Sequence, residues 1–422
     1  MDAGRIVRPL VAEDLDAWLV ILANAYPIMD LHTAEERAAR LGSARMRLDT
    51  PGIRSYGLFH KDRLLGGMQL YDFEMTCFEA PLLVGGVGMV AVDLAHKREH
   101  VARDLISFYL RHYRERGAPL AILYPFRPDF YGAMGFGYGP KQNTYRISPD
   151  ALPVRGDKSR ARFLTDEDRG VMIALYNAVA MGAHGMIALT PATAATYLTQ
   201  PKQRLVGWFD ATGALRGYMA FTFEMPDRQR SFLLQDLEIH ELIYSDSEAL
   251  LGLLAFLRAQ RDQVRAVILH TLLDGFHYLL ADPRNGPDRP TPNVYHESNT
   301  QGVGLMYRLL DVRRFFEALP NHRFGVETLT MRLTLRDSFL PEHDGSIVVR
   351  FERGVAHVEA SRTRVEVELT LAVSDASALL MGCLSLRALH DFGLAEVSDG
   401  RYVSRLDALF HVERPPVCLT AF

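Results

Sequence analysis

The sequence has few cysteines, no long apolar run and little net charge, and each scarcity excludes a class of protein. Its three cysteines, Cys77, Cys383 and Cys418, are too widely spaced for a disulfide framework or for the paired spacing of a zinc site. No stretch approaches the roughly 18 uninterrupted apolar residues that a membrane span needs. Residues 1–5 include an acidic residue and are not followed by an apolar core of signal-peptide length. We therefore expect a cytoplasmic protein without a membrane span.

The charge balance and composition indicate a globular protein. The chain has 47 Lys and Arg against 51 Asp and Glu, a net charge of −4, so it lacks the whole-chain basic field of many nucleic-acid binders, and we expect no nucleic-acid partner. Hydrophobic residues make up 48% and charged residues 23%, values that exclude a disordered or fibrous chain. A length of 422 residues allows two to four domains, and we expect three.

The first part of the chain alternates between helical and strand patterns. Apolar residues at three- and four-residue spacing predict helices over 15–30, 33–47 and 101–117, the last ending at Gly117. Runs of β-type residues predict strands over 55–60, 64–73, 82–92 and 120–124. This order of elements defines the first predicted unit.

The same order returns after residues 149–162, which are rich in Pro, Asp, Arg and Gly and are predicted to be an exposed linker. Helices are predicted over 166–179, 192–198 and 247–260, and strands over 204–210, 215–224, 233–242 and 266–271. The chain therefore contains a degenerate duplication, in which one copy can keep a site that the other has lost.

The loop before the second long helix differs between the two copies. A helix N-terminus offers free backbone N–H groups and a positive dipole end, which suits a phosphate. The first copy adds Lys97, Arg98 and Arg103, whereas Asp246 and Glu248 of the second copy would repel an anion. We therefore predict an anion site in the first copy.

A third unit is predicted from about residue 301, after the polar segment 282–299. Strand patterns at 327–335, 346–351 and 364–371 give way to helical patterns at 374–380 and 385–392. The chain ends in an apolar segment, 417–422, which is unusual because chain ends are normally polar and frayed. We expect this tail to be docked.

Two segments that flank the basic loop resemble a known family. A glycine-rich strand precedes the loop, with the sequence Gly85-Gly86-Val87-Gly88-Met89-Val90-Ala91-Val92, and an aromatic turn follows the next strand, with the sequence Phe130-Tyr131-Gly132-Ala133-Met134-Gly135-Phe136. These segments resemble the GCN5-related N-acetyltransferases (GNAT). The whole chain, with its degenerate second copy and the later segment Gly304-Leu305-Met306-Tyr307-Arg308-Leu309-Leu310-Asp311-Val312, resembles the Eis (enhanced intracellular survival) acetyltransferases.

The resemblance implies an α+β (mixed α/β) fold class, with two tandem acyl-CoA N-acetyltransferase (GNAT) folds and a sterol-carrier-protein-like (SCP2-like) α+β domain. The expected limits are 1–148 for the acetyl-CoA-binding GNAT domain, 149–295 for the degenerate second one and 296–422 for the C-terminal domain. Similarity to the relatives also suggests a homo-oligomer, with a hexamer among the expected forms.

The resemblance also implies roles for individual residues. Backbone N–H groups around Val90, Ala91 and Val92 would hold the thioester carbonyl and the pantetheine arm of acetyl-CoA. The pyrophosphate would lie against the loop and helix start that comprise Lys97, Arg98, Glu99, His100, Val101, Ala102 and Arg103. Tyr131 matches the family tyrosine that protonates the departing thiolate. Reference pKa values of about 10 for tyrosine and about 8.5 for a thiol are compatible with that transfer.

The family's base is the C-terminal carboxylate, which here belongs to Phe422. An exposed terminal carboxyl has a pKa of about 3.3–3.7, so burial would have to raise this pKa, or a water molecule would have to relay the proton. No other Asp or Glu stands out beside Tyr131, and Asp30 and Glu74 are only guesses for contacts with the acceptor.

One loop residue departs from the family pattern, because His100 stands where the family usually carries a small glycine. The loop needs exposed N–H groups rather than glycine itself, so a helical conformation at His100 would still serve.

Each candidate also has a structural interpretation. Tyr131 could pack on Phe130 and Phe136 as a turn aromatic, Phe422 could simply pack, and the loop cations could form a solvated helix face. His96 and His100 have the spacing of a metal pair, but no third ligand is evident, so we expect no metal.

We therefore expect an acetyl-CoA-dependent N-acetyltransferase whose acceptor is a small-molecule or peptide amine, of an aminoglycoside-like or lysine type. The alternative is a lipid-binding or scaffold protein with inactive acetyltransferase folds. An apolar pocket in residues 301–422 that the tail leaves open would favour the alternative, whereas a tail that leads into the first unit would count against it.

Overall fold

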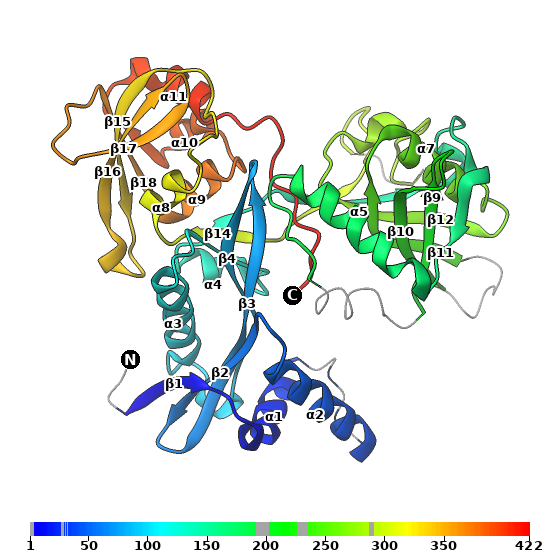
Figure 1. Cartoon of the computed structure of the whole chain (residues 1–422), viewed down its shortest axis with the longest axis horizontal. Helices are drawn as coiled ribbons and strands as arrows, with labels where there is room; N and C mark the ends of the chain where they lie inside the picture. Colours follow the sequence, from blue (N-terminus) through cyan, green and yellow to red (C-terminus); the bar gives the residue numbers. More distant parts are fainter. Residues whose placement is uncertain are drawn as a thin grey trace. The chain divides into compact units, whose positions relative to one another are not determined.

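The computed structural model describes residues 4–26, 29, 31, 33–190, 202–225, 235–286 and 291–422. The chain divides into two compact units (Figure 1). Unit 1 consists of Met1–Gly139 together with Leu305–Phe422, and unit 2 of Pro140–Gly304. The predicted domain limits at 148 and 295 stay a prediction. The predicted helix at 192–198 and Asp30 lie outside the described residues.

Unit 1 is built on a seven-stranded sheet with the spatial order β1-β2-β3-β4-β5-β14-β6. Its strands are β1 (Arg5–Pro9), β2 (Ile53–His60), β3 (Arg63–Cys77), β4 (Ala80–Val92), β5 (Leu120–Leu123), β6 (Gly137–Tyr138) and β14 (Met306–Leu309). Side chains alternate between the faces of a strand, so Phe59 and Leu64 pack with helix α1 (Leu15–Ala25), whereas Leu58 and Leu65 pack with helix α3 (Val101–Glu115). The helices therefore cover opposite faces.

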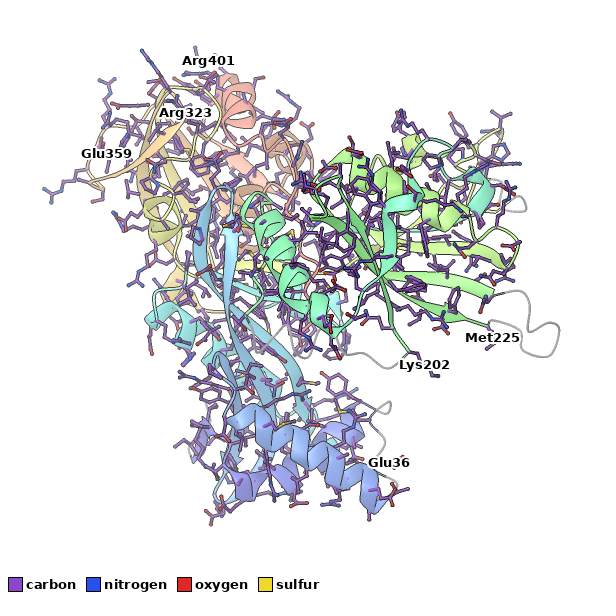
Figure 2. All side chains as sticks on the ribbon, turned by 45° about the vertical axis from the view of Figure 1, so that its right-hand side comes forward. Glu36, Lys202, Met225, Arg323, Glu359 and Arg401 are labelled. Carbon is purple, nitrogen blue, oxygen red and sulfur yellow. The ribbon has the colours of Figure 1, made fainter. Side chains whose placement is uncertain are left out.

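Helix α2 (Ala34–Leu48) contacts α1 and β2 but has no buried side chain. Glu36, labelled in Figure 2, lies in its first turn. The helix begins with a capping box: the Thr33 hydroxyl accepts a hydrogen bond from the Glu36 N–H at 3.1 Å, and the Glu36 carboxylate accepts one from the Thr33 N–H at 2.9 Å. The capping box therefore stabilises the start of the helix, and the partly buried Leu41, Ala44 and Leu48 pack on the core around α1.

Helix α3 approaches β4 closely because β4 carries a glycine at the contact. A Cβ on Gly85 would lie 2.3 Å from the Tyr113 ring. One turn earlier, the Tyr109 hydroxyl donates a hydrogen bond to the Gly85 carbonyl at 2.8 Å and accepts one from the Ile122 N–H at 3.0 Å. This phenol therefore ties α3 to both β4 and β5.

Strands β4 and β5 separate beyond the segment that Tyr109 contacts. They pair in parallel from Val84 to Val87 on β4 and from Leu120 to Leu123 on β5. Strand β4 then continues to Val92, with a bulge at Met89, whose φ is +50°. Within the described residues, the edge of β4 that faces β5 consequently has no strand partner over its last residues.

Unit 2 repeats this topology, as the duplication predicted. Its sheet has the order β13-β7-β12-β11-β10-β9-β8. The strands are β7 (Lys141–Ile147), β8 (Ala161–Phe163), β9 (Arg204–Phe209), β10 (Leu215–Glu224), β11 (Gln235–Tyr244), β12 (Val264–Thr271) and β13 (Thr300–Val303). Helices α5 (Arg169–Met181) and α7 (Ser247–Arg258) pack on this sheet.

The two sheets exchange one strand. In unit 1, β14 pairs antiparallel with β5 and β6, and in unit 2, β7 pairs antiparallel with β12 and β13. Thus β7, which follows the first copy in the sequence, belongs to the sheet of unit 2. Likewise β14, which follows the second copy, belongs to the sheet of unit 1. The segment at 304–312, which lies within the predicted third unit, contains β14 of the first sheet.

The predicted linker at 149–162 is partly wrong. Pro149 and Ala151 are buried, and Leu152 is fully buried in the apolar core of unit 2, whereas Val154 is exposed. Proline and glycine content identified a segment without long helices or strands, but Leu152 anchors its start to the core.

The C-terminal part of unit 1 contains a five-stranded sheet in the order β17-β16-β15-β18-β19. Its strands are β15 (Leu329–Arg336), β16 (Gly345–Glu352), β17 (Val355–Glu359), β18 (Val367–Ala372) and β19 (Ala395–Val397), and its helices are α8 (Val312–Glu317), α9 (Val373–Leu380), α10 (Leu386–Asp391) and α11 (Val403–Leu409). Phe339 and Leu340 join the core around α3. Among the described residues, no helix has the length and apolar character to cross a membrane.

Candidate functional site

A cavity of about 730 Å³ lies where β4 extends beyond its pairing with β5. The end of β4, the loop that follows, the start of α3 and helix α4 (Pro128–Gly132) all line it. The cavity brings together Tyr131 and every predicted cofactor-binding residue except Glu99, namely Val90, Ala91, Val92, Lys97, Arg98, His100, Val101, Ala102 and Arg103.

Glu99 faces a different hollow. Its backbone carbonyl accepts a hydrogen bond from Arg5 at 2.7 Å, and its carboxylate lies 3.0 Å from His96 Nδ1. Both partners and Glu99 line a second cavity, of about 640 Å³, beside the turn at Lys61 and Asp62. The carboxylate is therefore engaged by its neighbours, and His96 has an acidic partner.

The loop before α3 presents free backbone donors to the main cavity. His100 is the N-cap residue of α3, with φ +60° and ψ 12°, and no side chain caps the helix there. Arg98 also has a positive φ, of +66°. The backbone at His100 is therefore left-handed rather than helical, the conformation that glycine adopts without strain. The uncapped N–H groups at this end suit an anion.

Replacing His100 by glycine is expected to raise the free energy of unfolding by about 1 kcal/mol, because glycine relieves the left-handed strain. His100→Ala is the matched control, since it keeps the Cβ and gains nothing. If backbone N–H groups bind the ligand, the affinity for acetyl-CoA changes by less than about fivefold, the equivalent of one ordinary hydrogen bond. Thermal unfolding and calorimetry measure both quantities. A larger loss of affinity in both variants would instead make the imidazole a ligand.

Lys97 and Arg98 of the loop form no ion pairs within the described part of the chain. Both residues are exposed. The Arg103 guanidinium lies 5.5 Å from the centre of the Phe339 ring. The cations therefore leave a positive wall at the loop end of the cavity.

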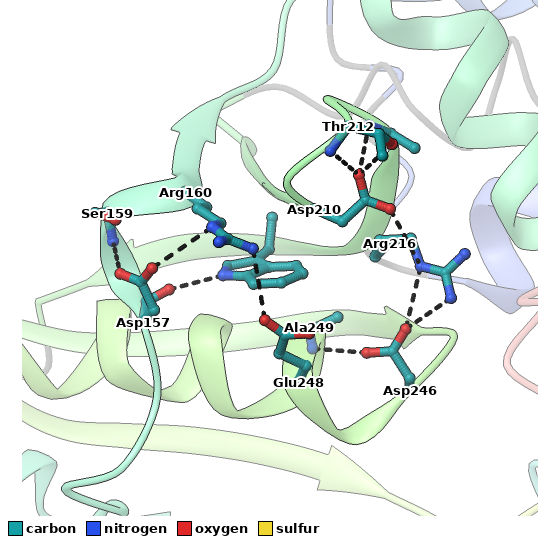
Figure 3. A network of polar contacts seen from close by, with 11 residues as sticks. Asp157, Ser159, Arg160, Asp210, Thr212, Arg216, Asp246, Glu248 and Ala249 are labelled. Atoms are coloured by element: carbon teal, nitrogen blue, oxygen red, sulfur yellow. Dashed lines mark hydrogen bonds and ion pairs between the residues drawn. The ribbon is translucent and has the colours of Figure 1, made fainter.

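In the corresponding loop of unit 2, acidic side chains cap the helix and form ion pairs (Figure 3). Asp246 caps helix α7 by accepting a hydrogen bond from the Ala249 N–H at 2.9 Å, and its carboxylate also binds Arg216 at 2.9 Å. Glu248 pairs with Arg160 at 3.5 Å. An acidic side chain thus occupies the helix end that an anion would need, which agrees with the predicted loss of the site in this copy.

Tyr131 lies across the cavity from the end of β4. Its ring packs edge-on against Phe130 at 5.2 Å and Phe136 at 6.1 Å, so the structural interpretation is also correct. The residue is 3% exposed, and its hydroxyl has no hydrogen-bond partner among the described residues. Burial and the nearby Tyr26 phenol raise its pKa well above the usual value, so the hydroxyl stays protonated at neutral pH.

Tyr26, just beyond α1, was not singled out from the sequence. It lines the cavity, and its hydroxyl donates a hydrogen bond to the Val90 carbonyl at 3.2 Å. It is also close enough to raise the pKa of both Tyr131 and Tyr71. Its position at the end of a helix offered no spacing or motif by which sequence reasoning could find it.

The C-terminal tail ends on β3 and β4, as its apolar character predicted. Cys418 and Thr420 are buried, and the Phe422 ring lies 4.9 Å from Phe73 and 5.2 Å from Tyr124. A Cβ on Gly88 would lie 3.1 Å from the terminal carbonyl carbon of Phe422, so the absence of a side chain at Gly88 admits the chain end. The terminus thus lies two residues from Val90 along β4.

Family models match most of the chain. Two acetyltransferase (GNAT) domain models match residues 6–139 and 181–309, and a sterol carrier protein domain model matches residues 312–419. An uncharacterized N-acetyltransferase of Streptomyces avermitilis is 26% identical over 92% of each chain. The chain belongs to the GNAT-family N-acetyltransferases.

The fold of this N-acetyltransferase matches solved structures over its full length. A probable N-acyltransferase from Enterococcus faecalis V583 superimposes with a TM-score of 0.81 at 18% identity, covering 99% of both chains. Eis1 from Mycobacterium abscessus gives a TM-score of 0.77 at 19% identity and covers 99% of this chain and 100% of its own. The predicted α+β class, with tandem GNAT folds and an SCP2 domain, is therefore confirmed, and the architecture is Eis-like.

GNAT domains use acetyl-CoA, and two GNAT domain models match this chain. The lipid-binding alternative would be favoured by a tail that leaves an apolar pocket open in residues 301–422. The tail instead leads to β4 in the first GNAT domain, with its terminal carbon beside Gly88. This position counts against that alternative.

Proposed function

We propose that this N-acetyltransferase transfers the acetyl group of acetyl-CoA to a primary amine, with Tyr131 as the general acid and the Phe422 carboxylate as the base. The observation that carries the proposal is the cavity at the split between β4 and β5, which collects the predicted cofactor residues and Tyr131 around one volume. The pantetheine arm lies along Val90–Val92, and the pyrophosphate binds residues 97–103, with the exception of the Glu99 side chain.

The transfer proceeds by direct attack. The neutral amine nitrogen forms a bond to the acetyl carbon, and the bond between that carbon and sulfur breaks. One proton leaves the nitrogen for the Phe422 carboxylate, and one passes from the Tyr131 hydroxyl to the thiolate. The products are the N-acetyl amine and free CoA, and the two protein groups recover their starting protonation by exchange with solvent.

The unpaired edge of β4 supports the placement of the thioester. Strand β5 ends its pairing at Leu123, so N–H groups on the last part of β4 have no strand partner on that side. Backbone donors held in place before the reaction stabilise the oxyanion without reorganisation. The hydrogen bond from Tyr26 to the Val90 carbonyl helps to hold this edge in position.

The position of Phe422 supports its role as the base. Its terminal carbon lies beside Gly88, and Val90, two residues further along β4, lines the acetyl-CoA cavity. The proposed position of the amine is between the carboxylate and the acyl carbon. Both expected acceptor classes, an aminoglycoside and a lysine side chain, present such an amine and belong in a first substrate panel.

Binding of acetyl-CoA tests the proposal first. Calorimetry of the full chain is expected to detect acetyl-CoA, and the double variant Lys97→Ala/Arg98→Ala should weaken binding by about tenfold per cation removed, with a shallower salt dependence. Arg362→Ala/Arg364→Ala, which removes two exposed cations of the C-terminal domain, is the matched control and should bind normally. Equal affinity in the two double variants would contradict the proposed pyrophosphate site.

A further inference from the structure

A third, smaller cavity is lined by Met89 of β4, the residue that precedes Val90 of the acetyl-CoA cavity. It has a volume of about 90 Å³ and lies between helices α1 and α2 and strands β2, β3 and β4. Consecutive residues of the β4 bulge therefore line the two cavities, close to the proposed position of the acyl carbon.

The floor of the small cavity is polar although it is buried. Gln69 and Ser55 are 5% and 6% exposed, and the Gln69 amide donates a hydrogen bond to the Ser55 hydroxyl at 3.3 Å. The Tyr71 hydroxyl donates one to the Gln69 side-chain carbonyl at 2.9 Å. The Tyr71 ring packs on Phe422, with ring centres 5.6 Å apart. Two hydrogen bonds thus connect the cavity floor to Tyr71, whose ring contacts the ring of the C-terminal residue.

The wall of the small cavity is positively charged. Arg40 and Arg47, one on each side of Ser43 and Ala44 along α2, line it, and no acidic side chain is among its described lining residues. Neither arginine has an ion pair or side-chain hydrogen bond within the described residues, whereas Arg37 on the same helix pairs with Asp16 at 2.7 Å. Arg47 is close enough to Tyr71 to oppose the rise of its pKa, which burial takes to about 12.

Helix α2 packs on the core through the partly buried Leu41, Ala44 and Leu48. Arg40 is exposed and Arg47 is partly buried, so a ligand can reach both side chains from the cavity. An arginine without an internal partner, beside a buried polar floor, favours a carboxylate or phosphate group, which the planar guanidinium can bind in a bidentate manner. A polycation would meet like charge at the same place.

We infer that the acceptor is a small amine that also carries an anionic group, a carboxylate or a phosphate, which Arg40 and Arg47 bind while the amine points to Met89 and Val90. This inference rests on the proposed acetyl transfer and narrows its acceptor class. The reaction is unchanged: the nitrogen gains the acetyl group, CoA leaves as the thiol, and the anionic group takes no part in bond making. A polycationic aminoglycoside is a poor acceptor.

Matched pairs of amines test the inference. Thiol release from acetyl-CoA is measured with phenethylamine against phenylalanine, with ethanolamine against O-phosphoethanolamine, and with kanamycin and a lysine peptide. At least one anionic member is expected to exceed its neutral partner in kcat/KM by about tenfold or more. Arg40→Gln/Arg47→Gln should remove this advantage through KM, with acetyl-CoA affinity unchanged. Arg37→Gln, whose arginine is paired with Asp16, is the control and should keep the advantage.

The outcomes separate the two proposals. Turnover that is equal or faster with neutral or polycationic amines overturns the inference and leaves acetyl transfer standing. Binding of acetyl-CoA without turnover of any anionic amine also overturns it. Failure of both acetyl-CoA binding and turnover with every amine overturns the proposed function as well. A phosphate advantage without a carboxylate advantage, or the reverse, identifies the anion and supports the inference.

Discussion

Replacing Tyr131 by phenylalanine is expected to lower kcat by about 10²–10⁴-fold, the contribution of a positioned general acid. The ring keeps its edge-on contacts with Phe130 and Phe136, so the fold should survive. The hydroxyl has no hydrogen-bond partner among the described residues, and its removal therefore leaves no buried group unsatisfied. Steady-state thiol release measures kcat, and calorimetry should show the same affinity for acetyl-CoA.

Tyr138→Phe is the matched control, because Tyr138 lies nearby on β6 and its side chain is half exposed. This variant should retain full activity. The pH profile of kcat distinguishes a proton donor from a packing residue. The kcat of the wild type is expected to fall at high pH as Tyr131 ionises, and this fall should lie above the usual tyrosine range because burial raises the pKa of Tyr131. Tyr131→Phe should not show this fall. Unchanged kcat in Tyr131→Phe would contradict the general-acid role.

Deletion of Phe422 is expected to reduce kcat by a similar factor of about 10²–10⁴, because it removes the carboxylate from its position beside Gly88. The deletion also removes a ring that packs on Tyr71, Phe73 and Tyr124. Loss of activity by itself therefore does not distinguish base catalysis from packing, and two further variants are needed.

The first variant, Phe422→Leu, keeps the terminal carboxylate and part of the apolar contact, so it should retain most of the activity. The second adds one glycine after Phe422, which keeps the ring but moves the carboxylate by one residue, and it should be as inactive as the deletion. Kinetic assays of the deletion, Phe422→Leu and the extended chain, together with their acetyl-CoA affinities, distinguish base catalysis from packing. A fully active extended chain would contradict the role of the carboxylate as the base.

Local patterns in the sequence were sufficient to predict most strands of the first sheet and the basic loop before α3. The apolar stripe of α3 and its stop at Gly117 predicted a helix that the structure places at Val101–Glu115, with Gly117 at φ +87°. The contrast between Lys97 and Arg98 in one copy and Asp246 and Glu248 in the other predicted which helix end is free, because N-terminal charge acts locally.

The remaining features depend on contacts between distant segments. Strand β14 has only four residues and its pairing partners lie far away in sequence, so no periodicity indicated the sheet to which it belongs. His100 carries a backbone conformation that its residue type disfavours, and loop context overrides that preference. The small cavity joins α2 to β3 and β4, and its arginines were indistinguishable in sequence from a solvated helix face.

The strand exchange constrains how the chain reaches its native state on the ribosome. The first sheet cannot close until β14, at Met306–Leu309, has been synthesised, long after β6 at Gly137–Tyr138. At synthesis rates of about 5–20 residues per second, the nascent first domain waits roughly ten to thirty seconds with its β5 edge open. A free edge of that kind can pair with another chain, so this intermediate is exposed to aggregation until β14 pairs with β5.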